Sequence, residues 1–144
     1  MLYLPIVVTF SSLLLFPNQR PESLHPNFAI AYNNRGYAKY ALGKKQEAIA
    51  DYDRAIQLNP NFAIAYNNRG LAKYALGKNQ DAIADYDLAI KLDSNDAIAY
   101  FGRGSAKYAL GKNQDAIADY DRAIQLNPNY AIRHLRKQSK PLCS

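Results

Sequence analysis

The 144-residue sequence has no tryptophan, one cysteine, one methionine and two histidines. With Cys143 as its single cysteine, the chain cannot form an internal disulfide, and no cysteine–histidine cluster has the spacing of a zinc site. Glycine-rich phosphate loops and nucleophile elbows are also missing. Carboxylates such as Asp51 and Asp53 lie two residues apart, so on a helix they point to different sides and form no acid–base pair. We therefore expect a protein that is not an enzyme and that uses no metal or cofactor.

The charge of the chain is positive overall but unevenly distributed. Apolar residues make up 49% and charged residues 21% of the sequence, as in an ordinary soluble domain, and the net charge is +6. Residues 60–127 carry equal numbers of basic and acidic side chains. Four of the positive charges lie near the C-terminus, at Arg133, Arg136, Lys137 and Lys140. A nucleic-acid-binding face needs basic side chains gathered along the folded surface, so this distribution argues against a nucleic-acid partner.

A 34-residue repeat accounts for most of the chain. The first copy, residues 26–59, reads PNFAIAYNNRGYAKYALGKKQEAIADYDRAIQLN, and the second, residues 60–93, matches it at 28 of 34 positions. The third copy spans residues 94–127, and a fourth begins as PNYAI and then departs. The remaining segments are predicted to be an apolar N-terminal leader (1–25), a C-terminal capping helix (128–138) and a frayed tail (139–144).

Each copy has the pattern of two helices. In the first copy, apolar side chains recur at helical spacing from about Ala29 to Leu42 and again from about Gln46 to Leu58. Gly43 lies between them, where a left-handed residue often ends a helix. Pro60 follows the second segment, where a helix cannot continue but a new one can begin. The sequence therefore predicts three helix–turn–helix units.

A unit of this length and pattern resembles the tetratricopeptide repeat (TPR) family. The residues of the first copy that carry the resemblance are Tyr32, Gly36, Ala48, Tyr52, Ala55 and Pro60. The other two copies match at the same places, except that Ser94 replaces the proline after the second copy. The resemblance covers residues 26–127 and reaches to about Gln138. It implies an all-α fold, a right-handed superhelical solenoid, and a non-catalytic scaffold that binds a protein or peptide in a concave groove.

Two positions in each copy depart from the family pattern, and both carry positive charge. A leucine of the pattern is replaced by Arg35, Arg69 and Arg103, and a later aromatic residue by Lys39, Lys73 and Lys107. Each second helix carries two aspartates, Asp51 and Asp53 in the first copy. A charge between helices is costly without a partner, so we predict that each arginine is partly buried and paired with one of these carboxylates. The alternative is a solvated charge ladder, worth about 0–1 kcal/mol per pair.

Nine of the 12 tyrosines fall at three equivalent places in the copies. An aromatic stripe at helical spacing usually belongs to the core. We expect two of the sets to pack between helices and the third to face the groove. The two core sets are Tyr32, Tyr66 and Tyr100, and Tyr52, Tyr86 and Tyr120; the groove set is Tyr40, Tyr74 and Tyr108.

The family resemblance places the groove on the first helix of each repeat, where the copies also differ. Residues that hold the fold should repeat, whereas residues that contact a non-repeating ligand are free to differ. The predicted groove residues are Asn33, Asn34, Tyr37, Tyr40, Asn67, Asn68, Leu71, Tyr74, Phe101, Ser105 and Tyr108. Asparagine can hydrogen-bond an extended peptide backbone, and the aromatic rings offer apolar contact. Neutral drift between recent duplicates is the alternative explanation of the differences.

Some members of the family hold a C-terminal carboxylate with lysine, asparagine and arginine side chains in the groove. Asn68 occupies one such place, but Ile98 and Gly102 stand where basic residues are needed. The resemblance therefore does not extend to capture of chaperone tails in this way.

Residues 2–16 form an uncharged apolar stretch, long enough for the core of a signal peptide and short for a membrane span. No lysine or arginine precedes it, and Pro5 interrupts it. It is an export signal or membrane anchor, a cover for the end of the solenoid, or a poorly ordered leader or mis-assigned start. Localisation stays open between the cytoplasm and export or membrane anchoring. Two other functions stay open: a fragment of a larger repeat array, and a membrane- or RNA-associated accessory acting through its basic tail.

Overall fold

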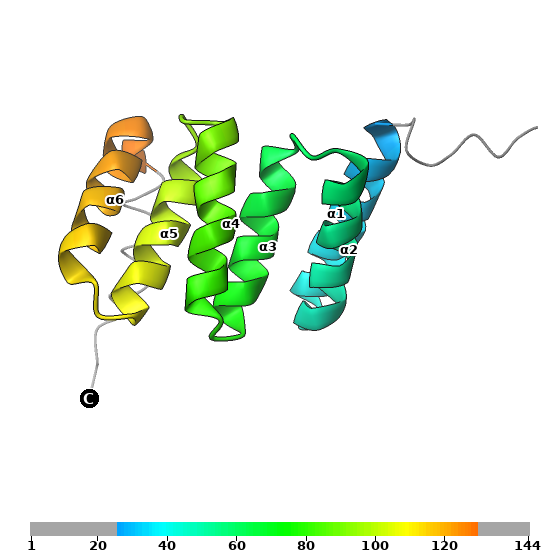
Figure 1. Ribbon diagram of the computed structural model, residues 1–144, viewed down its shortest axis with the longest axis horizontal. Coiled ribbons are helices and arrows are strands. Elements are labelled where there is room, and N and C mark those ends of the chain that lie inside the picture. The colour runs from blue at the N-terminus through cyan, green and yellow to red at the C-terminus, as the bar shows by residue number, and fades with distance from the viewer. Residues whose placement is uncertain (1–25, 130–144) are drawn as a thin grey trace, which may run out of the picture.

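The computed structural model describes residues 26–129 as six α-helices joined by short connections, with no strand in this part of the chain (Figure 1). The helices are α1 (Pro26–Ala41), α2 (Lys45–Leu58), α3 (Ala63–Ala75), α4 (Asn79–Leu92), α5 (Ala97–Ala109) and α6 (Asn113–Leu126). The expected all-α fold is confirmed. The expectations for the leader at 1–25, and for the capping helix and tail beyond residue 129, fall on residues outside the described range.

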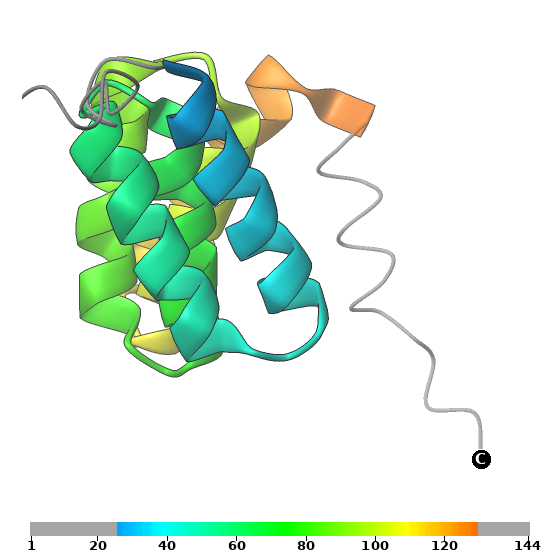
Figure 2. The same ribbon diagram turned by 90° about the vertical axis from the view of Figure 1, so that its right-hand side faces the viewer.

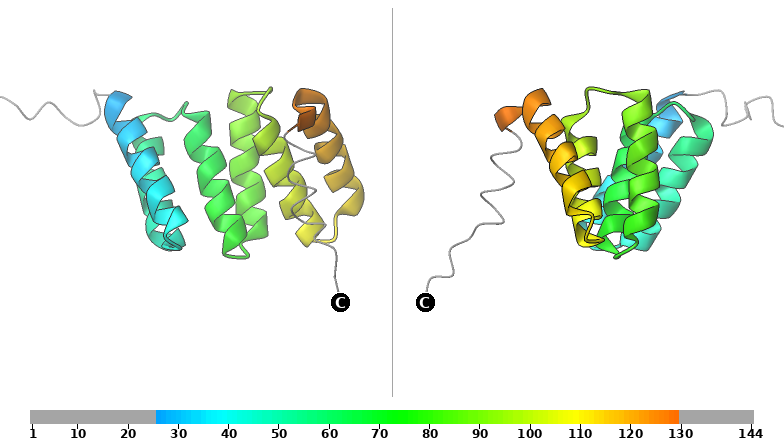
Figure 3. Two further views of the ribbon diagram at one scale, coloured as in Figure 1. Left: turned by 180° about the vertical axis from the view of Figure 1, so that it is seen from behind. Right: turned by 60° about the vertical axis from the view of Figure 1, so that its left-hand side comes forward.

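The helices form a solenoid of three hairpins. Each first helix packs against the second helix of its own repeat, and α2 and α4 also pack against the first helix of the next repeat. Figures 1 and 3 show the helices standing in a row that follows the chain, and Figure 2 looks along this row. Contacts of α3 with both α1 and α5 keep the first helices together along one side. None of the six described helices is both long and apolar enough to cross a membrane.

Glycine sets the turn inside each hairpin. Gly43, Gly77 and Gly111 have φ angles of 79°, 75° and 75°, a region that other residues rarely adopt. In the second hairpin, the Gly77 amide donates to the carbonyl of Tyr74 and the Lys78 amide to that of Lys73, both at 2.9 Å. These bonds satisfy carbonyls that the end of α3 would leave unpaired. The first helix therefore ends at Ala41, one residue before the predicted Leu42, and the turn at Gly43 lies where it was predicted.

The core of the solenoid is built from alanines and one tyrosine per repeat. Tyr52 and Tyr86 are the largest fully buried side chains, and each lies against a glycine of the preceding helix. A Cβ atom on Gly70 would lie 3.0 Å from the Tyr86 ring, so the absence of a side chain there lets the helices approach. Tyr120, the equivalent residue of the last repeat, is only partly buried.

The other two tyrosine sets behave differently. The set at Tyr32, Tyr66 and Tyr100 is half-buried. The Arg69 guanidinium, for example, lies over the Tyr66 ring, with its Cζ 5.5 Å from the ring centre. Of the set expected to face the groove, Tyr40 and Tyr74 pack against the buried clusters, while Tyr108 is largely exposed. Tyr40 and Tyr74 are thus partly buried and contribute to the core, and their contact with a ligand stays a prediction.

Candidate functional site

Four positions on each first helix share one side of that helix. They are spaced i, i+3, i+4 and i+7, which places them on a single helical face. We call the combined surface of the three helices the first-helix face. Its members are Ile30, Asn33, Asn34 and Tyr37 on α1, Ile64, Asn67, Asn68 and Leu71 on α3, and Ile98, Phe101, Gly102 and Ser105 on α5.

The first-helix face is uncharged and partly apolar. None of its twelve residues carries a charge. Ile30, Ile64 and Ile98 are each about half exposed, and Tyr37 and Leu71 are exposed as well. Neighbouring exposed apolar side chains of this kind commonly mark an interaction surface. The sequence prediction did not include the three isoleucines, because their exposure depends on how the helices stack and is not evident within one copy.

The asparagines of this face divide into structural and accessible members. Asn33 and Asn67 are buried, and each makes a hydrogen bond between repeats. Asn33 Oδ1 accepts from Asn68 Nδ2 at 2.9 Å, and Asn67 Nδ2 donates to Asp96 Oδ2 at 3.1 Å. Asn34 is exposed and Asn68 half-buried. Of the four asparagines predicted to line a groove, Asn34 and Asn68 are therefore the two within reach of a ligand.

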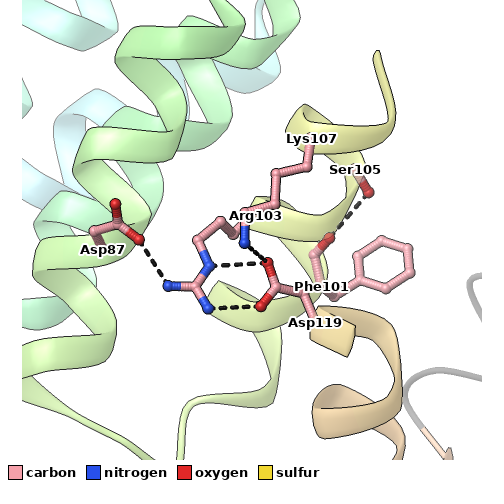
Figure 4. A network of polar contacts seen from close by, with 6 residues as sticks. All are labelled: Asp87, Phe101, Arg103, Ser105, Lys107 and Asp119. Atoms are coloured by element: carbon pink, nitrogen blue, oxygen red, sulfur yellow. Dashed lines mark hydrogen bonds and ion pairs between the residues drawn. The ribbon is translucent and has the colours of Figure 1, made fainter. Parts of the chain in front are cut away.

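Packing accounts for much of the sequence difference in the third repeat. Ser105 is buried, and its hydroxyl donates to the Phe101 carbonyl at 3.0 Å (Figure 4). The same hydroxyl accepts from the Tyr120 hydroxyl at 3.2 Å. The Phe101 ring lies 5.4 Å from the Tyr120 ring. At Gly102, a Cβ atom would lie 2.5 Å from Cζ of the buried Tyr86. These three departures from the first repeat thus fit the interior of the last hairpins.

On another side of the first helices, basic residues pair with aspartates of the second helices. Arg69 forms a two-point bond with Asp85, with Nε–Oδ2 at 2.9 Å and Nη2–Oδ1 at 2.6 Å. Its third nitrogen, Nη1, donates to Asp53 of the preceding repeat at 2.6 Å. Lys73 also contacts Asp85, at 2.7 Å. The Arg69 side chain is 17% exposed, so the predicted partly buried and paired arginine is confirmed, with one carboxylate more than expected.

The third repeat has the same arrangement, and the first has part of it. Figure 4 shows Arg103 held by Asp119 and by Asp87 of the preceding repeat. Arg35 pairs with Asp51 at 2.6 Å, yet its side chain is 59% exposed. Within residues 26–129, no carboxylate of a preceding helix reaches Arg35 as Asp53 reaches Arg69. The first arginine is therefore only half enclosed.

These pairings lower the pKa values of two buried carboxylates, Asp51 and Asp119. The hydrogen bond from Arg35 is the main cause that lowers the pKa of Asp51, helped by Lys39. At Asp119, desolvation raises the pKa, but the hydrogen bonds from Arg103 and Lys107 together outweigh it and the net shift is downward. The carboxylates are thus stabilised as anions beside their cations, and within residues 26–129 no group of three or more His, Cys, Asp or Glu could hold a metal ion.

Comparisons with known proteins agree with this architecture. Family models described as TPR repeat and tetratricopeptide repeat match residues 36–77 and 67–131. The first TPR of Spaghetti (RPAP3), bound to the HSP90 peptide SRMEEVD, is 34% identical, with a TM-score of 0.73; the match covers 83% of this chain and 97% of that one. The second TPR domain of human RPAP3, in complex with the HSP70 peptide SGPTIEEVD, is 32% identical, with a TM-score of 0.71 and coverage of 81% and 100%. The Arabidopsis OM64 TPR domain is 30% identical, with a TM-score of 0.71 and coverage of 78% and 98%. A search of curated proteins finds no match.

Proposed function

Because this chain belongs to the tetratricopeptide repeat family, we propose that it is a non-catalytic scaffold that binds an extended, uncharged segment of a partner protein along its first-helix face. TPR domains are in general protein-interaction modules, and the solved neighbours include complexes with short peptides. The observation that carries the proposal is that all twelve positions of the face are uncharged, with a half-exposed isoleucine in every repeat.

The chemistry of the face fits a peptide backbone with apolar side chains. Beyond the bonds that they make with Asn33, the amides of Asn34 and Asn68 keep donor hydrogens and acceptor capacity, which suits the alternating groups of an extended chain. Isoleucines at the same place in successive repeats offer apolar contact at regular intervals. Exposed Tyr37 and Leu71 extend this apolar surface toward the ends of α1 and α3. A partner segment with amide and aliphatic side chains would therefore be the best match.

The ligand we propose differs from the peptides in the neighbouring structures. Those peptides, SRMEEVD and SGPTIEEVD, end in Glu-Glu-Val-Asp. An acidic peptide laid on the first-helix face would lose hydration from its carboxylates without gaining a cation, which is unfavourable. The basic residues of the first helices are engaged by aspartates such as Asp85 and Asp119. We therefore propose selection for uncharged peptides, with binding that depends little on salt.

A direct test uses immobilised peptide arrays and fluorescence anisotropy with the full chain. The probes are a library of uncharged heptapeptides rich in Ile, Leu, Asn and Gln, together with SRMEEVD. We expect uncharged peptides to be selected, with affinities that change less than about twofold between about 50 and 500 mM salt, because no ion pair contributes. The proposal fails if SRMEEVD binds better than every uncharged peptide.

Variants locate the binding surface. Ile64→Asp places a charge in the middle of the first-helix face and should weaken binding of the selected peptide at least about tenfold, the equivalent of 1.4 kcal/mol. Ala84→Asp is the matched control, because this position on α4 is exposed and so are its equivalents Ala50 and Ala118. Circular dichroism should show equal helicity in both variants. Equal affinity of Ile64→Asp and wild type would place binding elsewhere.

A further inference from the structure

The first helix of the described stack exposes residues that its copies bury. Ala65 and Ala72 on α3 are fully buried, as are Ala99 and Ala106 on α5. The equivalent residues on α1, Ala31 and Ala38, are exposed. Ala31 also lines a shallow pocket with Phe28, Tyr32 and Arg35. We call the surface formed by Phe28, Ala31, Tyr32, Arg35 and Ala38 the α1 outer face; in α3 and α5 the same surface is covered by the preceding second helix.

Helix α6, the last of the six described helices, exposes side chains that α2 and α4 bury. Ile117 on α6 is 50% exposed, whereas its equivalents Ile49 and Ile83 are 7% and 8% exposed. Ile124 is exposed as well. Asp121 occupies the place from which Asp53 and Asp87 bond the arginine of the next repeat, yet it pairs with no cation within residues 26–129. We call the surface formed by Ile117, Tyr120, Asp121 and Ile124 the α6 outer face.

The two outer faces match an interface that already exists inside the molecule. Helix α6 is identical to α2 at 12 of 14 positions, and residues 29–41 are identical to residues 63–75 at 12 of 13. A contact between α6 of one molecule and α1 of another would therefore repeat the α2–α3 packing almost residue for residue. The charges are complementary as well, since Arg35 has an exposed side and Asp121 has no cation partner within residues 26–129.

The flanking sequences of the chain match these faces less well. Shifted back by one repeat, the place of α2 falls on residues 11–24, where Pro17 and Pro21 would lie inside the helix and Gln19 would replace the bridging aspartate. Shifted forward by one repeat, the place of the fully buried Ala65 and Ala99 falls on Arg133. The N-terminal segment thus lacks the bridging aspartate and the C-terminal segment lacks the buried alanine, while Lys137 keeps a positive charge at the place of Arg103.

We propose that the α6 outer face of one molecule docks on the α1 outer face of a second copy, head to tail, with Asp121 bonding Arg35. Such an interface joins different surfaces and leaves one face open at each end, so it adds further copies instead of closing a dimer. It would also bring the first-helix faces of successive copies into one continuous row.

The test is sedimentation velocity on the full chain and on variants that block one face each. Ala31→Arg blocks the α1 outer face, and Ile117→Arg blocks the α6 outer face. The matched controls are Ala50→Arg and Ala118→Arg, at positions that are exposed in every repeat. We expect the mean mass of the wild type and of both controls to rise between about micromolar and millimolar concentration, while each blocking variant stays monomeric.

Mixing the two blocking variants provides the decisive result. Ala31→Arg keeps a functional α6 outer face and Ile117→Arg a functional α1 outer face, so together they should form a one-to-one dimer and nothing larger. A wild type that stays monomeric throughout would overturn the proposal and indicate that the faces are covered by the chain's own flanking segments. Association that persists in both blocking variants, or a mixture that remains monomeric, would equally overturn it.

Discussion

Arg69 reaches back across the boundary between two repeats to Asp53, with Nη1 and Oδ1 2.6 Å apart. The rest of its guanidinium is bound to Asp85 within its own repeat. One side chain therefore ties α3 both to the helix before it and to the helix after it. In a repeat protein, where stability is the sum of repeat and nearest-neighbour contributions, such a residue contributes to both.

Removing the Arg69 side chain should lower the stability of the protein. In Arg69→Leu, the buried carboxylate of Asp85 keeps only Lys73, and the bond between repeats is lost. We expect a loss of about 3 kcal/mol in the free energy of unfolding, measured by urea denaturation. Arg35→Leu is the comparison, and it should shift the urea midpoint clearly less than Arg69→Leu does, because that arginine is largely exposed. An Arg69→Leu midpoint equal to or above that of the wild type would show that the pair is not needed.

Stability should fall in acid because of the paired aspartates. The pKa values of Asp51 and Asp119 are lowered in the folded state, so the unfolded state takes up protons first as the pH falls. Their contribution is complete above the unfolded pKa of about 3.9 and is lost as the pH drops through the lower folded values. Melting temperatures recorded from neutral pH downward should show this decline.

Replacement of one carboxylate should reduce that dependence. Asp119→Asn is expected to be less stable at neutral pH and to lose less stability than the wild type on acidification. Asp115→Asn is the control, since Asp115 is exposed and pairs with no cation within the described helices. Parallel acid profiles for Asp119→Asn and the wild type would contradict the assignment.

Replacement by alanine should destabilise the protein at two glycines, for a different reason at each. In Gly102→Ala the new Cβ atom would lie 2.5 Å from Cζ of Tyr86, and relieving this overlap should cost about 1–3 kcal/mol. In Gly77→Ala no atom lies within 4 Å, but the φ angle of 75° should cost about 1 kcal/mol. Double-mutant cycles with Tyr86→Leu separate the two effects. Strong coupling is expected for Gly102 and none for Gly77; coupling of equal size would refute the explanation.

Asp96 should contribute more to the free energy of unfolding than an ordinary helix N-cap does. Its Oδ1 accepts from the amides of Ile98 at 2.8 Å and Ala99 at 3.2 Å, and its Oδ2 accepts from the buried Asn67. Asp96→Ala should cost about 2 kcal/mol, because it removes the cap and leaves a buried amide without its partner. In the double variant with Asn67→Ala the two losses should not add. Asp93→Ala, at an exposed turn, serves as the control in the same urea titration.

The sequence predicted the stack and the Arg–Asp pairs because both follow from the repeat itself. The arginine and its own aspartate recur 16 residues apart in every copy, so one copy is enough to suggest the pair. The second partner, Asp53 for Arg69, was not specified, because it depends on how one hairpin is rotated against the next. That rotation arises from packing between alanines and tyrosines, which the spacing within one copy does not reveal.

The candidate site was predicted only in part for a related reason. Asn33 and Asn67 occupy the same place in two copies but bond different residues, Asn68 and Asp96, because the following repeats differ there. Burial of Ser105 likewise depends on Tyr120 in the next helix. Differences between copies can therefore arise from packing against neighbouring repeats, without any contact to a ligand. Exposure, which identified the isoleucines, becomes visible only when the helices are assembled.

The contact between Gly102 and Tyr86 has a consequence for folding. Near-identical hairpins give a growing chain several equivalent ways to pair its helices, and mispairing is a common failure of repeat proteins. At the place of Gly102, α3 carries Asn68, which bonds Asn33 of the preceding repeat. The boundary before α3 is therefore marked by a hydrogen bond between two amides, and the boundary before α5 by a tyrosine ring against a glycine. Repeats that are almost identical in sequence are thus joined by two chemically different contacts.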